Sequence, residues 1–200
     1  MNEIKFRLMN ENDDVSQVSF LLVQADPYIY SPLWGDLDNQ VKAFSYLIQN
    51  MPCFSYDHIL IALKDEIIVG ALLFLKRGDT FCSQIAKETY LFFDQKVPKE
   101  YELTLEGYFK PTFNFDTDYY LFNVSTDLTY RNLGIASGLL KKFIRMCPKD
   151  SSISLEVVTE NVNALRLYEN YGFRAYDEFQ TFYLLDDGHR SLKMILHKKI

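Results

Sequence analysis

The stretch RNLGIA, Arg131 to Ala136, lies between the apolar run YYLFNV, Tyr119 to Val124, and a helical pattern of apolar residues at Leu139, Leu140, Phe143 and Ile144. This order predicts a strand, a glycine-containing turn and the start of a helix. Gly134 has no side chain to keep an anion from the backbone, and the first amides of a helix have no partner within it. The stretch therefore predicts a backbone cradle for a phosphate-like anion, although an ordinary strand-to-helix turn has the same pattern.

A second informative segment follows, LEVVTENVNALRLYENYGF, from Leu155 to Phe173. Its apolar start predicts a buried strand that begins at Ile153 and leads into the polar cluster Thr159 to Asn161. Asn161 or Asn163 can cap the helix that follows, and Gly172 stands where helices end. The helix itself is predicted by four residues at helical spacing: Ala164, Leu167, Tyr168 and Tyr171.

Together, the two segments resemble the GCN5-related N-acetyltransferase (GNAT) family of acyl-CoA transferases. The family's acyl-CoA loop pattern is matched by Arg131, Gly134 and Ala136. Its later pattern is matched by Asn161, Ala164, Leu167, Tyr168, Gly172 and Phe173. The resemblance covers about residues 3–198 and implies an α/β (α+β) fold. In that fold a mixed, mostly antiparallel sheet of about seven strands is flanked by about four helices.

The composition fits one domain over residues 1–200. A chain of this length with 48% hydrophobic residues can bury a core without metals or disulfides. Three scattered cysteines without metal-ligand spacing indicate reduced thiols in a cytoplasm and no metal site. A net charge of −6 gives no reason to expect nucleic-acid binding and mildly favours a cationic substrate, although acidic surfaces usually serve solubility.

No targeting or membrane segment is expected. The N-terminus, MNEIKFRLMNENDD, mixes charged with apolar residues and is not typical of a signal peptide. The longest apolar run, Ile67 to Leu75, is far shorter than the roughly 20 residues that a membrane helix needs. The sequence therefore predicts a soluble, cytoplasmic protein.

Periodicity predicts the elements along the chain. Strands are expected over residues 4–8, 59–63, 67–75, 119–126, 153–158, 179–185 and 191–197. Helices are expected from about 12 to 25, over 37–48, 134–146 and 163–171, with a further one from about Ser83 to Phe93. Pro27 is interpreted as the end of the first helix, and the segment after it, PYIYSPLWG, as a connection rich in turn formers. The stretch 76–117 is interpreted as a family-specific insertion between the third and fourth strands.

The resemblance implies acetyl-CoA as co-substrate and assigns residues to it. The turn would offer backbone amides to the pyrophosphate through Arg131, Asn132, Leu133, Gly134, Ile135, Ala136 and Ser137. The family often has Gly where this chain has Asn132, and Asn is the residue that next best tolerates a left-handed backbone. The main chain of Val124, Ser125 and Thr126 would pair with pantetheine in a gap between two splayed strands. Asn161 would hydrogen-bond the pantetheine arm, and a plain helix cap is a compatible reading of it.

Tyr168 is the predicted general acid. A CoA thiol has a pKa near that of Cys, about 8.5, and a phenol near 10 can protonate it as the C–S bond breaks. The alternative is a core aromatic residue with a polar tip, because the chain has 14 Tyr and 16 Phe.

Glu156 is a possible base. A lysine-type amine is neutral in only about one molecule in 2,500 at pH 7, so it needs help to lose its proton. The placement of Glu156 in LEVV is similar to that in the ribosomal-protein N-terminal acetyltransferase branch of the family, where such a Glu is thought to act through water. A strand Glu that merely faces solvent is the alternative. His58, His189 and His197 are isolated in the sequence and are not expected to serve.

The acceptor pocket in this fold is implied to lie at the first two helices and their connection. Tyr28, Tyr30 and Trp34 are therefore candidates for lining it, with Tyr101, Tyr108 and Phe109 of the insertion. Aromatic residues can hold an organic cation, but hydrophobic filling explains them equally.

We therefore expect an N-acetyltransferase that moves an acetyl group to a small-molecule or peptide amine without a metal. A non-catalytic acyl-CoA-binding or regulatory module with the same fold is the alternative. A nucleotide-binding protein is disfavoured because the turn lacks the Lys and Ser or Thr of a P-loop. Monomer and homodimer both remain open.

Overall fold

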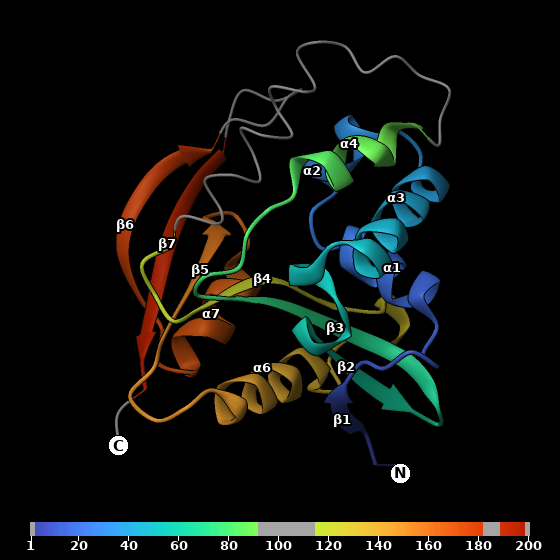
Figure 1. Cartoon of the computed structure of the whole chain (residues 1–200). Helices are drawn as coiled ribbons and strands as arrows, with labels where there is room; N and C mark the ends of the chain where they lie inside the picture. The colour runs from blue at the N-terminus through green and yellow to red at the C-terminus, as the bar shows by residue number, and fades with distance from the viewer. Residues whose placement is uncertain (1–2, 92–114, 182–188, 199–200) are drawn as a thin grey trace.

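The computed structural model describes residues 3–91, 115–181 and 189–198. Seven strands form one sheet in the order β1-β2-β3-β4-β5-β7-β6 (Figure 1). All neighbouring strands are antiparallel except β4 and β5, so the expected mixed, mostly antiparallel sheet is confirmed. The strands are β1 (Lys5–Leu8), β2 (Ile59–Lys64), β3 (Ile67–Lys76), β4 (Tyr119–Thr126), β5 (Ser152–Val158), β6 (Arg174–Thr181) and β7 (His189–His197).

Helices cover both faces of the sheet, α1 to α4 on one side and α6 and α7 on the other (Figure 1). In the described ranges they are α1 (Val15–Val23), α2 (Pro27–Trp34), α3 (Leu37–Asn50), α4 (Ser83–Leu91), α6 (Ile135–Met146) and α7 (Val162–Asn170). Short 3₁₀ turns lie at η1 (Pro52–Phe54), η2 (Tyr56–His58) and η3 (Leu128–Tyr130). None of the described helices is both long and apolar enough to cross a membrane.

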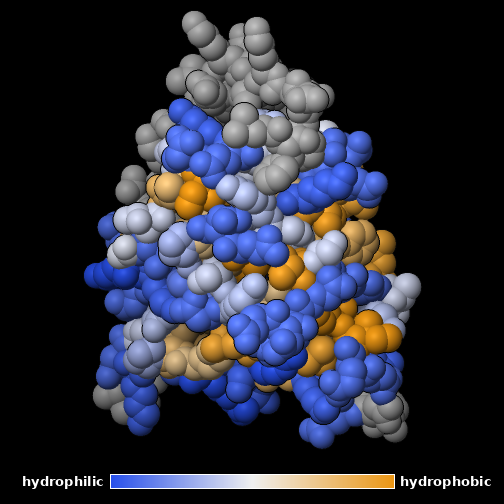
Figure 2. Space-filling model, turned by 45° about the vertical axis from the view of Figure 1, so that its right-hand side comes forward, coloured by the Kyte–Doolittle hydropathy of each residue, from blue (hydrophilic) through white to orange (hydrophobic). Residues whose placement is uncertain are grey.

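Two hydrophobic clusters hold these layers together. One joins α1 to α4 with one face of β2 and β3, around Phe44 and Phe54. The other joins α6 and α7 with the opposite face, around Leu139, Phe143 and Phe173. Because both faces of β3 are covered, its sequence IIVGALLFLK is an almost unbroken apolar run rather than an alternating one. Figure 2 shows a largely hydrophilic outer face that is crossed by a band of apolar residues.

Strands β2 and β3 form a hairpin with a two-residue loop, which fits the strands expected over residues 59–63 and 67–75. Asp65 and Glu66 connect the strands, and both have a positive φ, 52° and 61°. Two central residues with positive φ are typical of the tight turns whose twist matches that of the flanking strands.

Two elements differ from expectation. Helix α2 occupies the segment that we interpreted as a connection, because Pro27 begins a helix instead of ending one; proline is well tolerated in the first turn, where its missing N–H costs nothing. Strand β6 begins at Arg174, five residues before the expected start at 179. Residues 174–178 are exposed and mostly polar, so the edge strand lacks the apolar alternation on which the prediction relied.

Part of the predicted insertion lies outside the described residues. Helix α4 matches the expected helix near residues 83–93. Residues 92–114, with Tyr101, Tyr108 and Phe109, are not among those that the structure describes.

Candidate active site

Strands β4 and β5 separate in the middle of the sheet. They pair in parallel at three positions only, Tyr119 with Ile153, Tyr120 with Ser154 and Leu121 with Leu155. Beyond Leu121, β4 still pairs with β3 through Thr126, and β5 still pairs with β7 through Val158. The edges of residues 122–126 and 156–158 that face each other therefore do not pair, and each resembles the open edge of a sheet.

A cavity of about 630 Å³ lies at this gap. Its volume falls within the range that is usual for small-molecule and cofactor sites. Twelve of the residues predicted for the site line it: Val124, Ser125, Thr126, Arg131, Asn132, Gly134, Ile135, Ala136, Ser137, Glu156, Asn161 and Tyr168. Leu133, Tyr30 and Trp34 do not, and for Tyr28 the structure describes the backbone in α2 but not the side chain.

The turn before α6 has a left-handed backbone and free N–H groups, the features that an anion cradle needs. Asn132 and Gly134 both have left-handed backbone, with φ of 63° and 76°, so Asn132 does adopt the conformation that was expected of a glycine substitute. The first helical hydrogen bond runs from the Gly138 N–H to the Gly134 carbonyl. The N–H groups of residues 135–137 make no hydrogen bond within the described part of the chain. A Cβ added to Gly134 would meet no atom within 4 Å, so the space beside the turn is open.

Close packing holds this turn against the sheet. Gly70, in the middle of β3, faces the first turn of α6, and a Cβ there would come within 2.6 Å of the Ile135 side chain and 3.2 Å of the Ser125 carbonyl oxygen. The absent side chain thus allows α6 to lie directly on β3 beside the splayed end of β4. The hydroxyl groups of Ser137 and Tyr171, 2.7 Å apart, connect α6 with the end of α7.

Tyr168 lies on α7 and lines the cavity with only 5% of its surface exposed. Its ring packs edge-on against Phe173, with ring centroids 5.8 Å apart. No hydrogen bond from the described residues reaches its hydroxyl group. Burial raises the pKa of Tyr168 above its ordinary value, so the phenol keeps its proton at neutral pH, the form that a proton donor needs.

Glu156 lines the cavity from β5. The neighbouring Leu155 and Val157 belong to the cluster under α6 and α7, so the alternation of the strand turns Glu156 to the opposite face. Glu156 is exposed to solvent on this face, and protein atoms nonetheless surround much of its carboxyl group. This partial burial raises the pKa of the Glu156 carboxyl, and the charge of Lys193 on the paired strand opposes the shift.

Asn161 lines the cavity and also caps α7. Its Oδ1 accepts a hydrogen bond from the Ala164 N–H at 3.1 Å. The cap leaves the side-chain Nδ2 group available as a donor, since no hydrogen bond of the described residues uses it.

Tyr30 and Trp34 pack in the core between α2 and α3. Their rings stack in parallel with centroids 5.5 Å apart, and both meet Phe44 edge-on. The Trp34 Nε1–H donates to the Thr89 hydroxyl at 3.1 Å. Hydrophobic filling, the second of the two readings of these aromatic residues, describes their positions.

Other residues that line the cavity were not among the candidates from the sequence. Gln24, Ala25 and Asp26 come from the α1–α2 connection, Tyr120, Phe122 and Asn123 from β4, and Ser191 from β7. The connection was expected to contribute to the acceptor pocket, so its position carried a signal, but no pattern distinguished these residues within it. Nothing in the sequence indicated Asn123 or Ser191.

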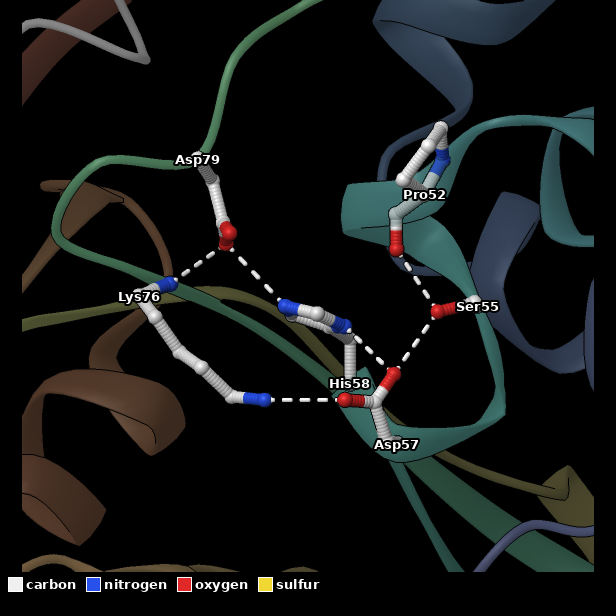
Figure 3. Close-up of polar contacts among 6 residues, drawn as sticks. All are labelled: Pro52, Ser55, Asp57, His58, Lys76 and Asp79. Carbon is white, nitrogen blue, oxygen red and sulfur yellow. Dashed lines mark hydrogen bonds and ion pairs between the residues drawn. The ribbon is translucent and has the colours of Figure 1, made fainter.

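His58 is placed away from the cavity, in a polar cluster at the junction of η2, β2 and the end of β3 (Figure 3). Its Nδ1 lies 2.9 Å from Asp57 and its Nε2 lies 3.1 Å from Asp79. Asp57 is partly buried, which opposes its ionisation, but hydrogen bonds from Ser55 and Lys76 hold the pKa of its carboxyl below the usual range. The cluster joins three segments of the chain and touches none of the residues that line the cavity. Among the described residues, no group of three or more His, Cys, Asp or Glu side chains could hold a metal ion.

Comparisons with known proteins agree with this geometry. A 55-residue segment is 34% identical to L-amino acid N-acetyltransferase AaaT of Escherichia coli (strain K12), covering 26% of this chain and about a third (34%) of that relative. The fold is similar to that of a crystal structure described as histone acetyltransferase HPA2 and related acetyltransferase from Corynebacterium glutamicum (TM-score 0.70, 19% identity, 100% of this chain and 98% of the other). It is also similar to that of Arabidopsis thaliana Naa50 in complex with a bisubstrate analogue, CoA-Ac-MVNAL (TM-score 0.57, 16% identity, 96% and 97%). The model of the acetyltransferase (GNAT) family matches residues 30–173, and the chain therefore belongs to that family.

Proposed function

We propose that this protein transfers an acetyl group from acetyl-CoA to a primary amine within one ternary complex. The observation that carries the proposal is the junction, in one cavity, of an anion cradle, an unpaired strand edge and the buried hydroxyl of Tyr168. Two similar proteins support acetyl-CoA as the acetyl donor. The Naa50 structure contains a CoA-based analogue, and the E. coli relative is an amino acid N-acetyltransferase.

The residues present fit acetyl-CoA. The free N–H groups of residues 135–137, with the helix dipole behind them, suit the pyrophosphate, and the open space beside Gly134 lets it approach. Arg131 at the same end adds a positive charge. Residues 124–126 pair with β3 on one edge, and their other edge, which faces the gap, offers hydrogen bonds to the amides of pantetheine. Asn161 Nδ2 is a further donor. The Thr126 hydroxyl is buried without a partner in the described part of the chain, which fits a site that a ligand completes.

The chemistry is a direct displacement. The amine nitrogen forms a bond to the thioester carbon and the C–S bond breaks. Tyr168 gives its proton to the departing sulfur, and Glu156 takes a proton from the amine through water. The phenol regains its proton from solvent or from the protonated base, so the enzyme is restored after each turnover.

A turnover screen with Tyr168→Phe tests this proposal. Purified protein is given acetyl-CoA with spermidine, kanamycin, L-methionine or a Met-Ala-Ala peptide, and thiol release is followed. We expect one class of amine to be acetylated, and kcat to fall by about 10²-fold or more in Tyr168→Phe because general acid catalysis contributes on that scale. The acetyl-CoA dissociation constant should be unchanged.

The screen also separates the alternatives. Acetyl-CoA binding without turnover on any amine would favour a non-catalytic acyl-CoA-binding module. Turnover that is equal in the wild type and in Tyr168→Phe would remove the acid role and leave the transferase.

A further inference from the structure

We propose that Asn123 holds the acceptor amine, with its side-chain oxygen Oδ1 accepting one N–H of the nitrogen that attacks. This inference rests on the proposed acetyl transfer. It assigns a residue to the amine, whereas the anion cradle concerns only acetyl-CoA.

The position of Asn123 follows from an irregularity in β4. The register between β3 and β4 shifts so that Leu73 pairs with Asn123 and Phe74 pairs with Leu121, which leaves Phe122 as an extra residue. Such a bulge re-aims the side chains beside it. Asn123 contacts α1 and α2 and lines the cavity at the point where β4 has just left β5.

The orientation of the Asn123 amide is fixed by its neighbours. Its Nδ2 group lies 3.3 Å from the Leu22 carbonyl oxygen and 2.8 Å from the Tyr30 hydroxyl oxygen. A backbone carbonyl can only accept a hydrogen bond, so the group that faces Leu22 must be the NH₂. Both amide hydrogens are thereby used, and Oδ1 is left with two lone pairs and no donor among the described residues.

Across the gap stands Glu156. Leu121 and Leu155 are the last paired residues, and Glu156 is the next residue of β5. Asn123 contacts the α1–α2 side of the sheet, and strand alternation turns Glu156 to that same side. An amide oxygen and a carboxylate thus flank the opening of the gap on one face.

This pair of acceptors matches a primary amine. A neutral primary amine has two N–H groups and one lone pair. If one N–H donates to Asn123 Oδ1 and the other towards Glu156 or its water, the lone pair is left for the thioester carbon. A secondary amine has only one N–H and must leave one acceptor unsatisfied, which is costly inside a cavity.

The test uses Asn123→Ala with Thr89→Val as a matched control. Thr89→Val removes two buried hydrogen bonds, one from Trp34 of α2 and one to the Ala86 carbonyl, and neither partner lines the cavity. Steady-state kinetics are measured with the best amine of the screen and with its N-methylated form, and acetyl-CoA binding is measured by calorimetry.

We expect Asn123→Ala to raise the KM for the amine by about tenfold or more, the scale of one hydrogen bond to a polar or charged group, while acetyl-CoA affinity stays within about twofold. The preference of the wild type for the primary over the N-methyl amine should largely disappear in this variant. Thr89→Val should lower thermal stability and change neither the KM for the amine nor the preference for the primary amine.

Three results would overturn the assignment. If Asn123→Ala and Thr89→Val have the same KM for the amine and the same preference for the primary amine, Asn123 has a structural role only. Equal use of primary and N-methyl amines by the wild type would do the same even if Asn123→Ala failed to fold. A wild type that binds acetyl-CoA and acetylates no amine would refute the proposed function and this inference together, whereas the first two results leave acetyl transfer intact.

Discussion

Glu156 experiences two opposing influences on its proton. Partial burial at the cavity raises the pKa of its carboxyl, and Lys193 on the neighbouring strand lowers it by a smaller amount. A base must be deprotonated to work. A raised pKa therefore brings the acid limb of the rate profile to a higher pH than that of an ordinary Glu, about 4.3.

The pH dependence of kcat/KM tests this role. In the wild type, kcat/KM calculated for the neutral form of the amine should fall as the pH drops through a value above about 4.3, because protonated Glu156 cannot accept the proton of the amine. Glu156→Gln should lose this limb and lower the plateau by about 10²-fold. An unchanged limb in Glu156→Gln would assign the titration to another group, and unchanged activity would remove Glu156 from the mechanism.

Single residues also mark where sequence reasoning stops. Asn132 was predictable because only its backbone conformation mattered, and few residue types adopt a left-handed φ. Asn123 was not, because its role depends on Leu22 and Tyr30, about a hundred positions earlier in the chain. His58 appeared isolated for the same reason, although Asp79 lies beside it in space.

Among the elements, α6 depends on a residue that it does not contain. Gly70 of β3 gives Ile135 the space to lie against the sheet. The turn that we propose as the anion cradle immediately precedes Ile135 in the chain. A methyl group at position 70 would overlap the Ile135 side chain and crowd the Ser125 carbonyl oxygen, so that the first turn of α6 would have to adjust.

Gly70 itself does not line the cavity, but Gly70→Ala should weaken acetyl-CoA binding through Ile135 and Ser125, which do. We expect a loss of stability of about 1–3 kcal/mol, the usual cost of overpacking, and a higher acetyl-CoA dissociation constant. Thermal unfolding and calorimetry measure the two effects. Ala71→Gly, on the opposite face of the same strand, is a control for lost strand stability alone, and an equal change in affinity there would contradict the explanation.

The elements were predicted well where apolar periodicity is strong and poorly where it is interrupted. The β2–β3 hairpin and α6 follow the pattern of their apolar residues. Helix α2 was missed because Pro27 can either end a helix or begin one, and only the packing of Tyr30 and Trp34 against Phe44 decides between them.

At the scale of the whole molecule, a ligand in the gap between β4 and β5 should act on two segments far apart in the chain. Acetyl-CoA is expected to slow hydrogen exchange at backbone amides of residues 122–126 and 156–158, because unpaired edges exchange readily and paired ones do not. Mass spectrometry of the free and bound protein measures this. Peptides from β1 and β2 are internal controls, and protection that is equal everywhere would indicate global stabilisation instead of local pairing.

The sequence predicted the order of strands and helices along the chain and the turn before α6, which we propose as the donor end of the cavity, since both depend on local patterns. The side that we propose for the acceptor is lined by the α1–α2 connection, the bulge of β4 and the middle of β5, which no local pattern connects. Sequence reasoning therefore predicted residues on the proposed acetyl-CoA side of the gap and missed those on the proposed amine side.

The three residue pairs that join β4 to β5 also decide how the molecule resists force. Sheet hydrogen bonds hold β1 to β4 as one plate and β5 to β7 as another. In the described part of the chain, the plates are joined directly by the pairs from Tyr119 to Leu121 and, just before them, by hydrogen bonds of Thr117 and Asp118 with Ser154 and Ser152. The remaining rigidity comes from the apolar cluster beneath, where Leu139 of α6 and Tyr168 of α7 belong with residues of both plates. We therefore expect a pulling force across the sheet to separate the two plates at the cavity first, and a ligand that hydrogen-bonds to both edges to raise the force that this requires.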